Sequence, residues 1–387
     1  MMTMGAAERR ARLAVRHGLA APAEDATEAA RRMVALHATD PASVFLAVRA
    51  RTPNVTVADI EDALYERRSL MRMLGMRRTM FVVPVEVAPV VEAACTKAIA
   101  VKQRRLYTKI LAEAGVGDEA WFADVEDGAE KALIRLGQAT GAQLSAAEPR
   151  LRTQILAAEG KAYERTQNIT TWVLFMLAAD GRIVRGRPRG TWASSQWSWS
   201  PVADWLPGGM PQLAEADARV ELARRWLAAF GPATAADLRW WTGWTAGQTK
   251  QALTALAPVE VDLDGAAGLV LADDLAPTPA PEPWVALLPA LDPTAMGWAG
   301  RSWYVGAHSP TLFDRSGNIG PTVWSDGRIV GGWAQRGDGE IGYRLLEDIG
   351  SEKADAVAAA AHGLSAWIGD VRVTPRFRTP LERELAS

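Results

Sequence analysis

The sequence contains little cysteine and histidine for its 387 residues, with one Cys and four His. Because Cys95 is alone, no disulfide can form within the chain, which is typical of a reducing compartment. His17, His37, His308 and His362 are too far apart to complete a zinc-binding pattern with a single cysteine. We therefore expect no metal site and a cytoplasmic protein.

Long apolar segments and an excess of one charge are missing as well. The N-terminal residues lack the apolar core of a secretion signal, and no window approaches roughly eighteen uncharged apolar residues. We expect no membrane-spanning segment. The 43 Lys and Arg nearly balance the 45 Asp and Glu, for a formal net charge of -2. This excludes a uniformly basic surface, so any contact with nucleic acid must come from local clusters of arginine.

A similar order of helices and strands recurs three times along the chain. Each copy begins a helix in an A/V-T-x-A-D/Q-I/L signature, at Thr56, Thr140 and Thr234. Each signature lies upstream of a helix and a pair of short strands. This order is the one expected of a winged helix, in which a helix-turn-helix is followed by a β-hairpin. The alternative is that the repeat has no structural meaning, because Thr is a common helix N-cap and any α+β protein can show such similar segments.

The predicted fold class is α+β, with tandem winged-helix modules and a C-terminal antiparallel β-sheet or barrel subdomain. At roughly 100 to 200 residues per domain, the length suits two to four domains. We place the three winged helices at residues 1–84, 85–210 and 211–276, and the sheet subdomain with its closing helix and tail at 277–387. Short apolar runs between turn signals predict the strands of this subdomain, one of them at Trp303 to Val305.

Tryptophan is abundant, since 16 Trp outnumber the 5 Tyr and 7 Phe together. Several lie in the C-terminal part near arginines. Flat aromatic rings beside guanidinium groups suit stacking on bases and contacts with phosphate. Trp298, Arg301, Arg315 and Arg336 are therefore predicted to bind DNA. The alternative is that these aromatic residues form the core of a small barrel.

Two predicted hairpins carry clustered basic residues. The first has its turn at Gly75 to Thr79, and the second extends from Gly181 to Trp192. Arginines gathered on a β-turn suit contacts with phosphate, although an Arg-rich hairpin is often only a solvated edge that prevents aggregation. The residues predicted to contact DNA in the first two modules are Arg51, Arg77, Arg78, Thr79, Arg182, Arg185, Arg187 and Arg189.

Three longer motifs resemble a known family. They are LPxxDPTxMGW ending at Trp298, LFDRxGNIGPTVW from Leu312 to Trp324, and DGRIVGGWAQR from Asp326 to Arg336. With these motifs the whole chain resembles the AlkZ-like family of winged-helix DNA glycosylases. The resemblance implies a C-shaped monomer that grips double-stranded DNA. It also implies removal of bulky or crosslinked N-alkylated purines by hydrolysis of the N-glycosidic bond.

The family's catalytic Gln-x-Gln or Gln-x-Asp falls here on His37, Ala38 and Thr39, which departs from the family pattern. Cleavage passes through an oxocarbenium-like sugar and needs a polar group that positions or deprotonates water. We predict that His37 is a general base near its ordinary pKa of roughly 6.5, that Thr39 holds the water and that Asp40 orients the imidazole or counters charge. In the alternative, Asp40 and Thr39 cap the helix that begins at Pro41, and His37 is a structural core residue.

The leading hypothesis is a monofunctional DNA glycosylase that works without metal or organic cofactor. No lysine lies near His37 to attack the sugar, which disfavours a Schiff-base lyase. Two alternatives remain open. The same clamp could bind DNA without cleaving it, as a regulator or damage sensor, or a Trp-rich barrel could sequester a small molecule in a resistance protein.

Overall fold

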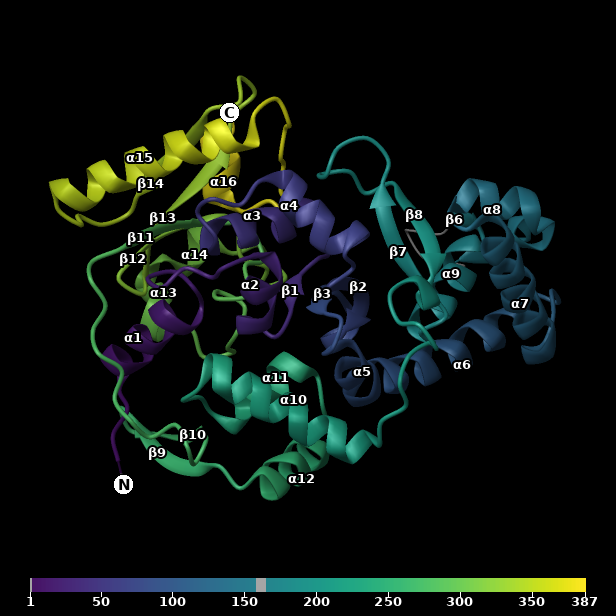
Figure 1. Ribbon diagram of the computed structural model, residues 1–387, viewed down its shortest axis with the longest axis horizontal. Helices are drawn as coiled ribbons and strands as arrows, with labels where there is room; N and C mark the ends of the chain where they lie inside the picture. Colours follow the sequence, from purple (N-terminus) through teal and green to yellow (C-terminus); the bar gives the residue numbers. More distant parts are fainter. Residues whose placement is uncertain (1, 158–164) are drawn as a thin grey trace.

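The computed structural model of the protein describes residues 2–157 and 165–387, which combine helices with five small antiparallel sheets (Figure 1). This mixture of helix and strand confirms the α+β class. None of the helices in these two ranges combines the length and the apolar character needed to cross a bilayer.

The first unit, residues 26–84, follows an N-terminal helix and contains the β1–β3–β2 sheet. The elements up to its end are α1 (Ala6–Arg16), α2 (Ala26–Arg32), β1 (Leu36–His37), α3 (Pro41–Arg51), α4 (Val57–Glu61), the π-helix η1 (Asp62–Glu66), β2 (Leu70–Gly75), the 3-10 turn η2 (Met76–Arg78) and β3 (Thr79–Pro84). The predicted hairpin with its basic turn at Gly75 to Thr79 is therefore confirmed.

Most of the second unit, residues 88–204, lies at the right of Figure 1, and its residues between 100 and 199 supply nearly all of a second hydrophobic core. Its helices are α5 (Ala88–Val91), η3 (Glu92–Thr96), α6 (Lys97–Glu113), α7 (Glu119–Leu136), α8 (Gly141–Ala147), η4 (Pro149–Arg152), α9 (Thr170–Ala179) and η5 (Val202–Asp204). Its strands are β4 (Ala139–Thr140), β5 (Gln154–Ala157), β6 (Arg165–Asn168), β7 (Ile183–Pro188) and β8 (Trp197–Pro201). The predicted hairpin within Gly181 to Trp192 was wrong in its second strand, because β7 pairs with β8 across a longer loop.

The third unit, residues 215–270, lies at the bottom of Figure 1. It consists of α10 (Glu215–Phe230), α11 (Ala235–Thr242), α12 (Ala246–Leu256), β9 (Val259–Leu263) and β10 (Ala266–Val270). The two strands are the pair of short strands expected downstream of Thr234, and they form a hairpin in which Val259 pairs with Val270.

The three predicted Thr caps are confirmed as N-caps. Thr56 begins α4, Thr140 begins α8 and Thr234 begins α11. Each hydroxyl accepts a hydrogen bond from the backbone N–H three residues on, and the Asp or Gln there accepts one from the backbone N–H of the Thr. This reciprocal pair of bonds satisfies N–H groups that the first helical turn leaves free. Thr245 begins α12 in the same way.

The C-terminal part contains a four-stranded antiparallel sheet in the order β11–β12–β13–β14. Its elements are β11 (Val285–Leu288), α13 (Ser302–Val305), η6 (Gly306–His308), α14 (Ser309–Leu312), β12 (Thr322–Ser325), β13 (Arg328–Gln335), β14 (Ile341–Leu345), α15 (Ser351–Ile368) and α16 (Pro380–Leu385). The strand predicted at Trp303 to Val305 was wrong, since these residues form α13. The helix lets Tyr304 turn inward, where its hydroxyl donates to the Ala295 carbonyl and its ring stacks on Trp324.

Tryptophans fill the core of this C-terminal part. Trp298, Trp324 and Trp333 have exposed fractions of 2%, 0% and 3%. Their indole N–H groups donate to Phe230, Thr322 and Leu288, so the buried polar edges are satisfied. The alternative interpretation, that these three rings form the core, is therefore the one that holds.

Candidate active site

His37, Ala38 and Thr39 link the edge of a sheet to the start of a helix. His37 ends β1, where it pairs with Phe81 of β3. The Ala38 N–H donates to the Met80 carbonyl at 2.8 Å, and its own carbonyl accepts from Arg72 Nη1 at 2.9 Å. The backbone of this tripeptide is thus held on both sides by the β2–β3 hairpin.

The His37 side chain is buried, with an exposed fraction of 7%, and packs edge-to-face on Phe81 at 5.3 Å between ring centroids. Burial and the charge of Arg77 lower its pKa to about 3. The expectation of a base near its ordinary pKa was therefore wrong, because the charged imidazolium loses its hydration and faces a second positive charge. Within the described residues the buried Nδ1 has no hydrogen-bond partner, so a neutral imidazole is left with a free nitrogen.

Asp40 is the N-cap of α3. Its Oδ1 accepts from the Ala42 N–H at 3.1 Å and its Oδ2 from the Arg376 N–H at 3.0 Å. Burial raises the pKa of this carboxyl, although both N–H groups act in the opposite direction. Asp40 therefore does not orient His37, and the capping reading is the correct one for it. Thr39 is half-buried, and its hydroxyl makes no hydrogen bond to any other residue that the structure describes.

On one side of the tripeptide, two arginines surround an indole ring. The guanidinium carbon of Arg72 lies 4.3 Å from the Trp197 ring centroid, and that of Arg185 lies 5.9 Å from the same ring. Arg72 is 3% exposed, and its Nε and Nη2 have no partner in the described chain. Burial, with the charges of Arg72 and Arg376, lowers the pKa of Arg185 to about 10.

A second pair of arginines, Arg77 and Arg301, lies against Trp240, at 4.1 and 4.8 Å from the ring centroid. Burial and the charge of Arg301 lower the pKa of Arg77 to about 10. The next residue, Arg78, is exposed and lies 5.3 Å from the Phe175 ring. Thr79 begins β3 and is half-buried. The structure thus brings predicted residues of the first hairpin close to His37.

Arg51 and Trp298 do not face DNA, and both predictions are corrected. Arg51 has an exposed fraction of 0% and forms an ion pair with Asp292, which is equally buried. Trp298 is buried and stacks on the His17 ring at 5.8 Å between centroids. Both side chains are buried and have partners inside the protein, so neither is exposed to a ligand.

Arg182 and Arg187 of the second unit have carboxylate partners, which corrects the prediction that they are free for phosphate. Arg182 pairs with Asp127 at 2.6 Å and also with Glu130. Arg187 pairs with Glu66 at 3.0 Å and with Glu61. Two carboxylates beside each guanidinium offset its charge. Arg189 is exposed in the loop after β7, and its backbone N–H donates to the Gln196 carbonyl.

The remaining predicted residues lie in the C-terminal part. Arg315 is exposed and lines an open cavity of about 950 Å³ with Arg376, Arg378 and Arg383. Arg336 is exposed and lies 4.0 Å from Glu340, at the turn between β13 and β14. Of Arg315 and Arg336, it is Arg315 that lies with other arginines.

Sequence reasoning missed Arg72, Trp240 and Arg376. Arg72 carried a signal, because it is the one charged residue in the apolar run Leu70 to Leu74. A charge at a buried strand position has to find hydrogen bonds, and such residues are candidates for a functional site. Trp240 and Arg376 carried no comparable signal, since only the tertiary fold brings them close to Arg77 and Asp40.

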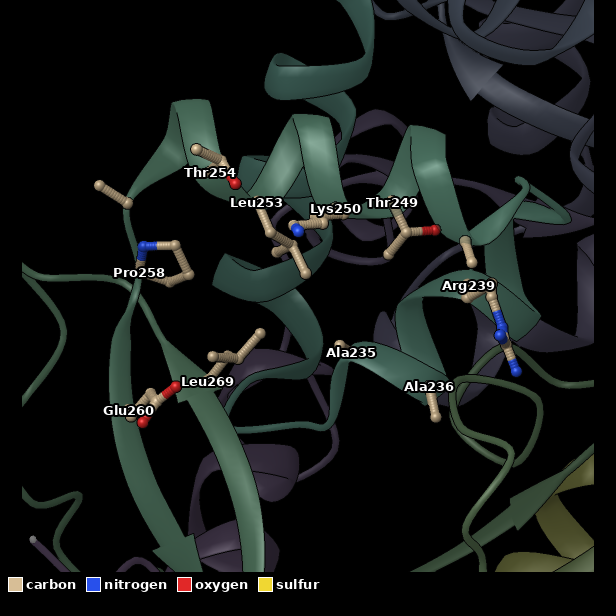
Figure 2. Close-up of a pocket in the computed structure, with 12 residues that line it drawn as sticks. Ala235, Ala236, Arg239, Thr249, Lys250, Leu253, Thr254, Pro258, Glu260 and Leu269 are labelled. Carbon is tan, nitrogen blue, oxygen red and sulfur yellow. The ribbon is translucent and has the colours of Figure 1, made fainter.

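A second cavity, of about 540 Å³, lies in the third unit between α11, α12 and the β9–β10 hairpin (Figure 2). Leu253 and Leu269 form much of its apolar lining, and its charged side chains are Arg239, Lys250 and Glu260. It includes no residue of the His37 region. No group of three or more possible metal ligands occurs in the part of the chain that the structure describes.

Residues 30–367 match the family described as DNA glycosylase AlkZ-like. The fold is similar to that of the Streptomyces sahachiroi DNA glycosylase AlkZ, with a TM-score of 0.74 and 20% sequence identity over 97% of this chain and 100% of that one. A search of curated proteins by sequence gives no match. Because the family match covers most of the 387 residues, the chain belongs to the AlkZ-like family of DNA glycosylases.

Proposed function

We propose that this protein is a DNA glycosylase that hydrolyses the N-glycosidic bond of bulky or crosslinked N-alkylated purines in double-stranded DNA. The observation that carries the proposal is the position of His37 and Thr39 next to arginines without carboxylate partners. Among residues 2–157 and 165–387, neither the His37 Nδ1 nor the Thr39 hydroxyl has a hydrogen-bond partner. Arg77 and Arg78 supply positive charge that the protein itself does not neutralise, which suits a phosphate backbone.

The two side chains suit the positioning of water. In this reaction the C1′–N bond breaks first, its electron pair leaves with the purine, and the sugar becomes oxocarbenium-like. Water then adds to C1′ and loses a proton to the solvent. Because such a sugar reacts readily, the water needs orientation more than a strong base. A neutral imidazole and a hydroxyl provide hydrogen bonds for that purpose, so a His37 with a pKa of about 3 is compatible with the role.

The three units are interpreted as tandem winged helices, with boundaries at residues 1–84, 85–210 and 211–276, followed by a sheet subdomain at 277–387. In the first unit, α2, α3 and α4 precede the β2–β3 hairpin, and β1 completes a three-stranded sheet. This order supports the interpretation. We further propose that a monomer clamps the duplex, with the β2–β3 hairpin directed to the DNA.

The test is an excision assay. Purified full-length protein is incubated with a duplex that carries one bulky 7-alkylguanine, and abasic sites are cleaved and counted. We expect product with the native chain and a large loss in His37→Ala. His308→Ala is the matched control, because His308 lies near Glu347 in the C-terminal part. Full excision by the His37→Ala variant would show that His37 is not part of the active site.

The second candidate is a DNA-binding protein that does not cleave. The family's two catalytic positions, which carry Gln and Gln or Asp, hold His37 and Thr39 in this chain. This difference favours the non-cleaving candidate, because neither side chain is a strong base here. Tight binding of alkylated duplex without abasic sites, across several alkylated bases, would support this candidate over the first.

A further inference from the structure

A cavity of about 380 Å³ lies between the first and second units. Its walls come from β2, the start of η3, α9, β7 and β8. The volume falls in the range of roughly 300 to 1,000 Å³ that is usual for small-molecule sites. The cavity shares Arg72, Arg185 and Trp197 with the surroundings of the His37 tripeptide, but neither His37 nor Thr39 lines it.

The walls of this cavity are unusually rich in methionine. Met71, Met73, Met80 and Met210 line it, together with the half-buried ring of Phe175. Methionine is flexible and polarizable, and its sulfur makes favourable contacts with aromatic rings. Such a lining favours a flat aromatic ligand over a polar or branched ligand.

Two buried charged groups of opposite sign also line the cavity. Arg72 has its Nη1 on the Ala38 carbonyl and its guanidinium near the Tyr65 hydroxyl, while Nε and Nη2 make no hydrogen bond of good geometry among residues 2–157 and 165–387. Glu92 is 4% exposed, and its Oε2 forms an ion pair with Lys97 Nζ at 3.4 Å but accepts no hydrogen bond of good geometry from the described residues. Buried polar atoms without partners are costly, so each is a candidate for a bond to a ligand.

We infer that this cavity binds a planar, two-ring heteroaromatic molecule that carries a carboxylate and a ring N–H. The carboxylate accepts hydrogen bonds from Nε and Nη2 of Arg72, with the Arg185 guanidinium adding positive charge. The ring lies between Phe175 and the methionine side chains. The ring N–H donates to the Glu92 carboxylate. One such ligand provides partners for Nε and Nη2 of Arg72 and gives Glu92 a hydrogen bond in addition to its ion pair with Lys97, whereas an apolar molecule of the same size provides neither.

Isothermal titration calorimetry of the full-length protein with indole-3-carboxylate tests this inference in the absence of DNA. We expect saturable one-to-one binding. 3-Methylindole, which lacks the carboxylate, should bind at least about tenfold more weakly, and benzofuran-3-carboxylate, which lacks the N–H, about three- to tenfold more weakly. No saturation up to about 1 mM indole-3-carboxylate would overturn the inference. Equal affinity for the three compounds would overturn the roles given to Arg72 and Glu92.

A pair of matched substitutions locates the binding. Ala178→Trp fills the cavity from α9, whereas Ala246→Trp adds the same ring to the separate cavity in the third unit (Figure 2). We expect Ala178→Trp to abolish the heat of binding and Ala246→Trp to leave it unchanged. Circular dichroism verifies that both variants are folded, and Thr171→Trp replaces Ala178→Trp if that protein unfolds. Unchanged binding in a folded cavity variant would place the ligand elsewhere. Because no DNA is present, the result is independent of glycosylase activity.

Discussion

Arg51 and Asp292 form a buried ion pair that joins the end of α3 to the segment after β11. Arg51 Nη2 lies 2.7 Å from Asp292 Oδ1, and Nη1 lies 2.9 Å from Oδ2. Arg51 also donates to Thr294 Oγ1 at 2.7 Å, and that oxygen is 3.0 Å from His17 Nδ1. Both Nη atoms of Arg51, both carboxylate oxygens of Asp292 and the Thr294 hydroxyl have partners inside the protein. It therefore connects the first unit to the C-terminal part.

We expect Asp292→Asn to lower the free energy of unfolding by about 3 to 5 kcal/mol, because the change leaves the charge of Arg51 buried without its counter-ion. Urea unfolding followed by tryptophan fluorescence measures the loss. Glu384→Gln is the matched control. Its pair with Arg344 has a similar distance of 2.7 Å, but exposed fractions of 58% and 49%. We expect less than about 1 kcal/mol there. Equal losses in both variants would contradict the importance of burial.

The sequence predicted local structure better than long-range pairing. Thr56, Thr140 and Thr234 begin helices as expected, because a capping bond depends on residues only three positions apart. Arg51 and Arg182 were assigned to DNA for their charge alone. Their partners, Asp292 and Glu130, lie 241 and 52 residues away, and the local sequence pattern does not predict these pairs.

The candidate site was partly predictable for the same reason. The family resemblance located His37 to Thr39, and the turn signals located Arg77 and Arg78. The pKa of His37 could not be predicted, since it depends on burial and on the charge of Arg77 across the fold. The capping of α3 by Asp40 was predicted as an alternative, because Asp40 directly precedes Pro41 and this dipeptide is a local signal for a helix start.

The stability of the protein should decrease as the pH falls below about 6.5. The pKa values of His17 and His37 are both lowered to about 3, mainly by burial. Between pH 3 and roughly 6.5 the unfolded chain therefore binds these protons and the folded chain does not. Each histidine then contributes up to about 1.4 kcal/mol of lost stability per pH unit.

Urea unfolding between pH 4 and 8 tests this titration by comparison of variants. His37→Gln should reduce the slope of stability against pH by about one proton below pH 6, and leave it unchanged above pH 7. His362→Gln is the control, because His362 is exposed on α15. A native slope retained in His37→Gln would show that His37 is protonated in the folded protein.

Excision should depend little on pH near neutrality. A base with a pKa near 6.5 loses activity as it becomes protonated below that pH, whereas His37 with a pKa of about 3 remains neutral. We expect the single-turnover rate to change less than about twofold between pH 5.5 and 8. His37→Ala should lower the rate by about a hundredfold, within the range for positioned polar groups. A rate that falls steeply as the pH drops through about 6.5 would indicate that His37 acts as a general base with an ordinary pKa.

DNA affinity should depend on arginines without carboxylate partners and not on total charge. Arg78 is exposed and has no ion pair among the described residues, while Arg182 is paired with Asp127 and Glu130. We expect Arg78→Gln to weaken binding of any duplex sequence. It should also reduce the slope of log K against log salt by about one. Fluorescence anisotropy with a labelled duplex between about 50 and 200 mM salt measures both effects.

Arg182→Gln removes the same formal charge and is the matched control for Arg78→Gln. Because Asp127 and Glu130 already offset the Arg182 guanidinium, it should leave the salt slope nearly unchanged. Equal slopes for the native protein and both variants would show that the β2–β3 hairpin makes no phosphate contact. A slope reduced only in Arg182→Gln would move the DNA contact to the second unit and away from His37.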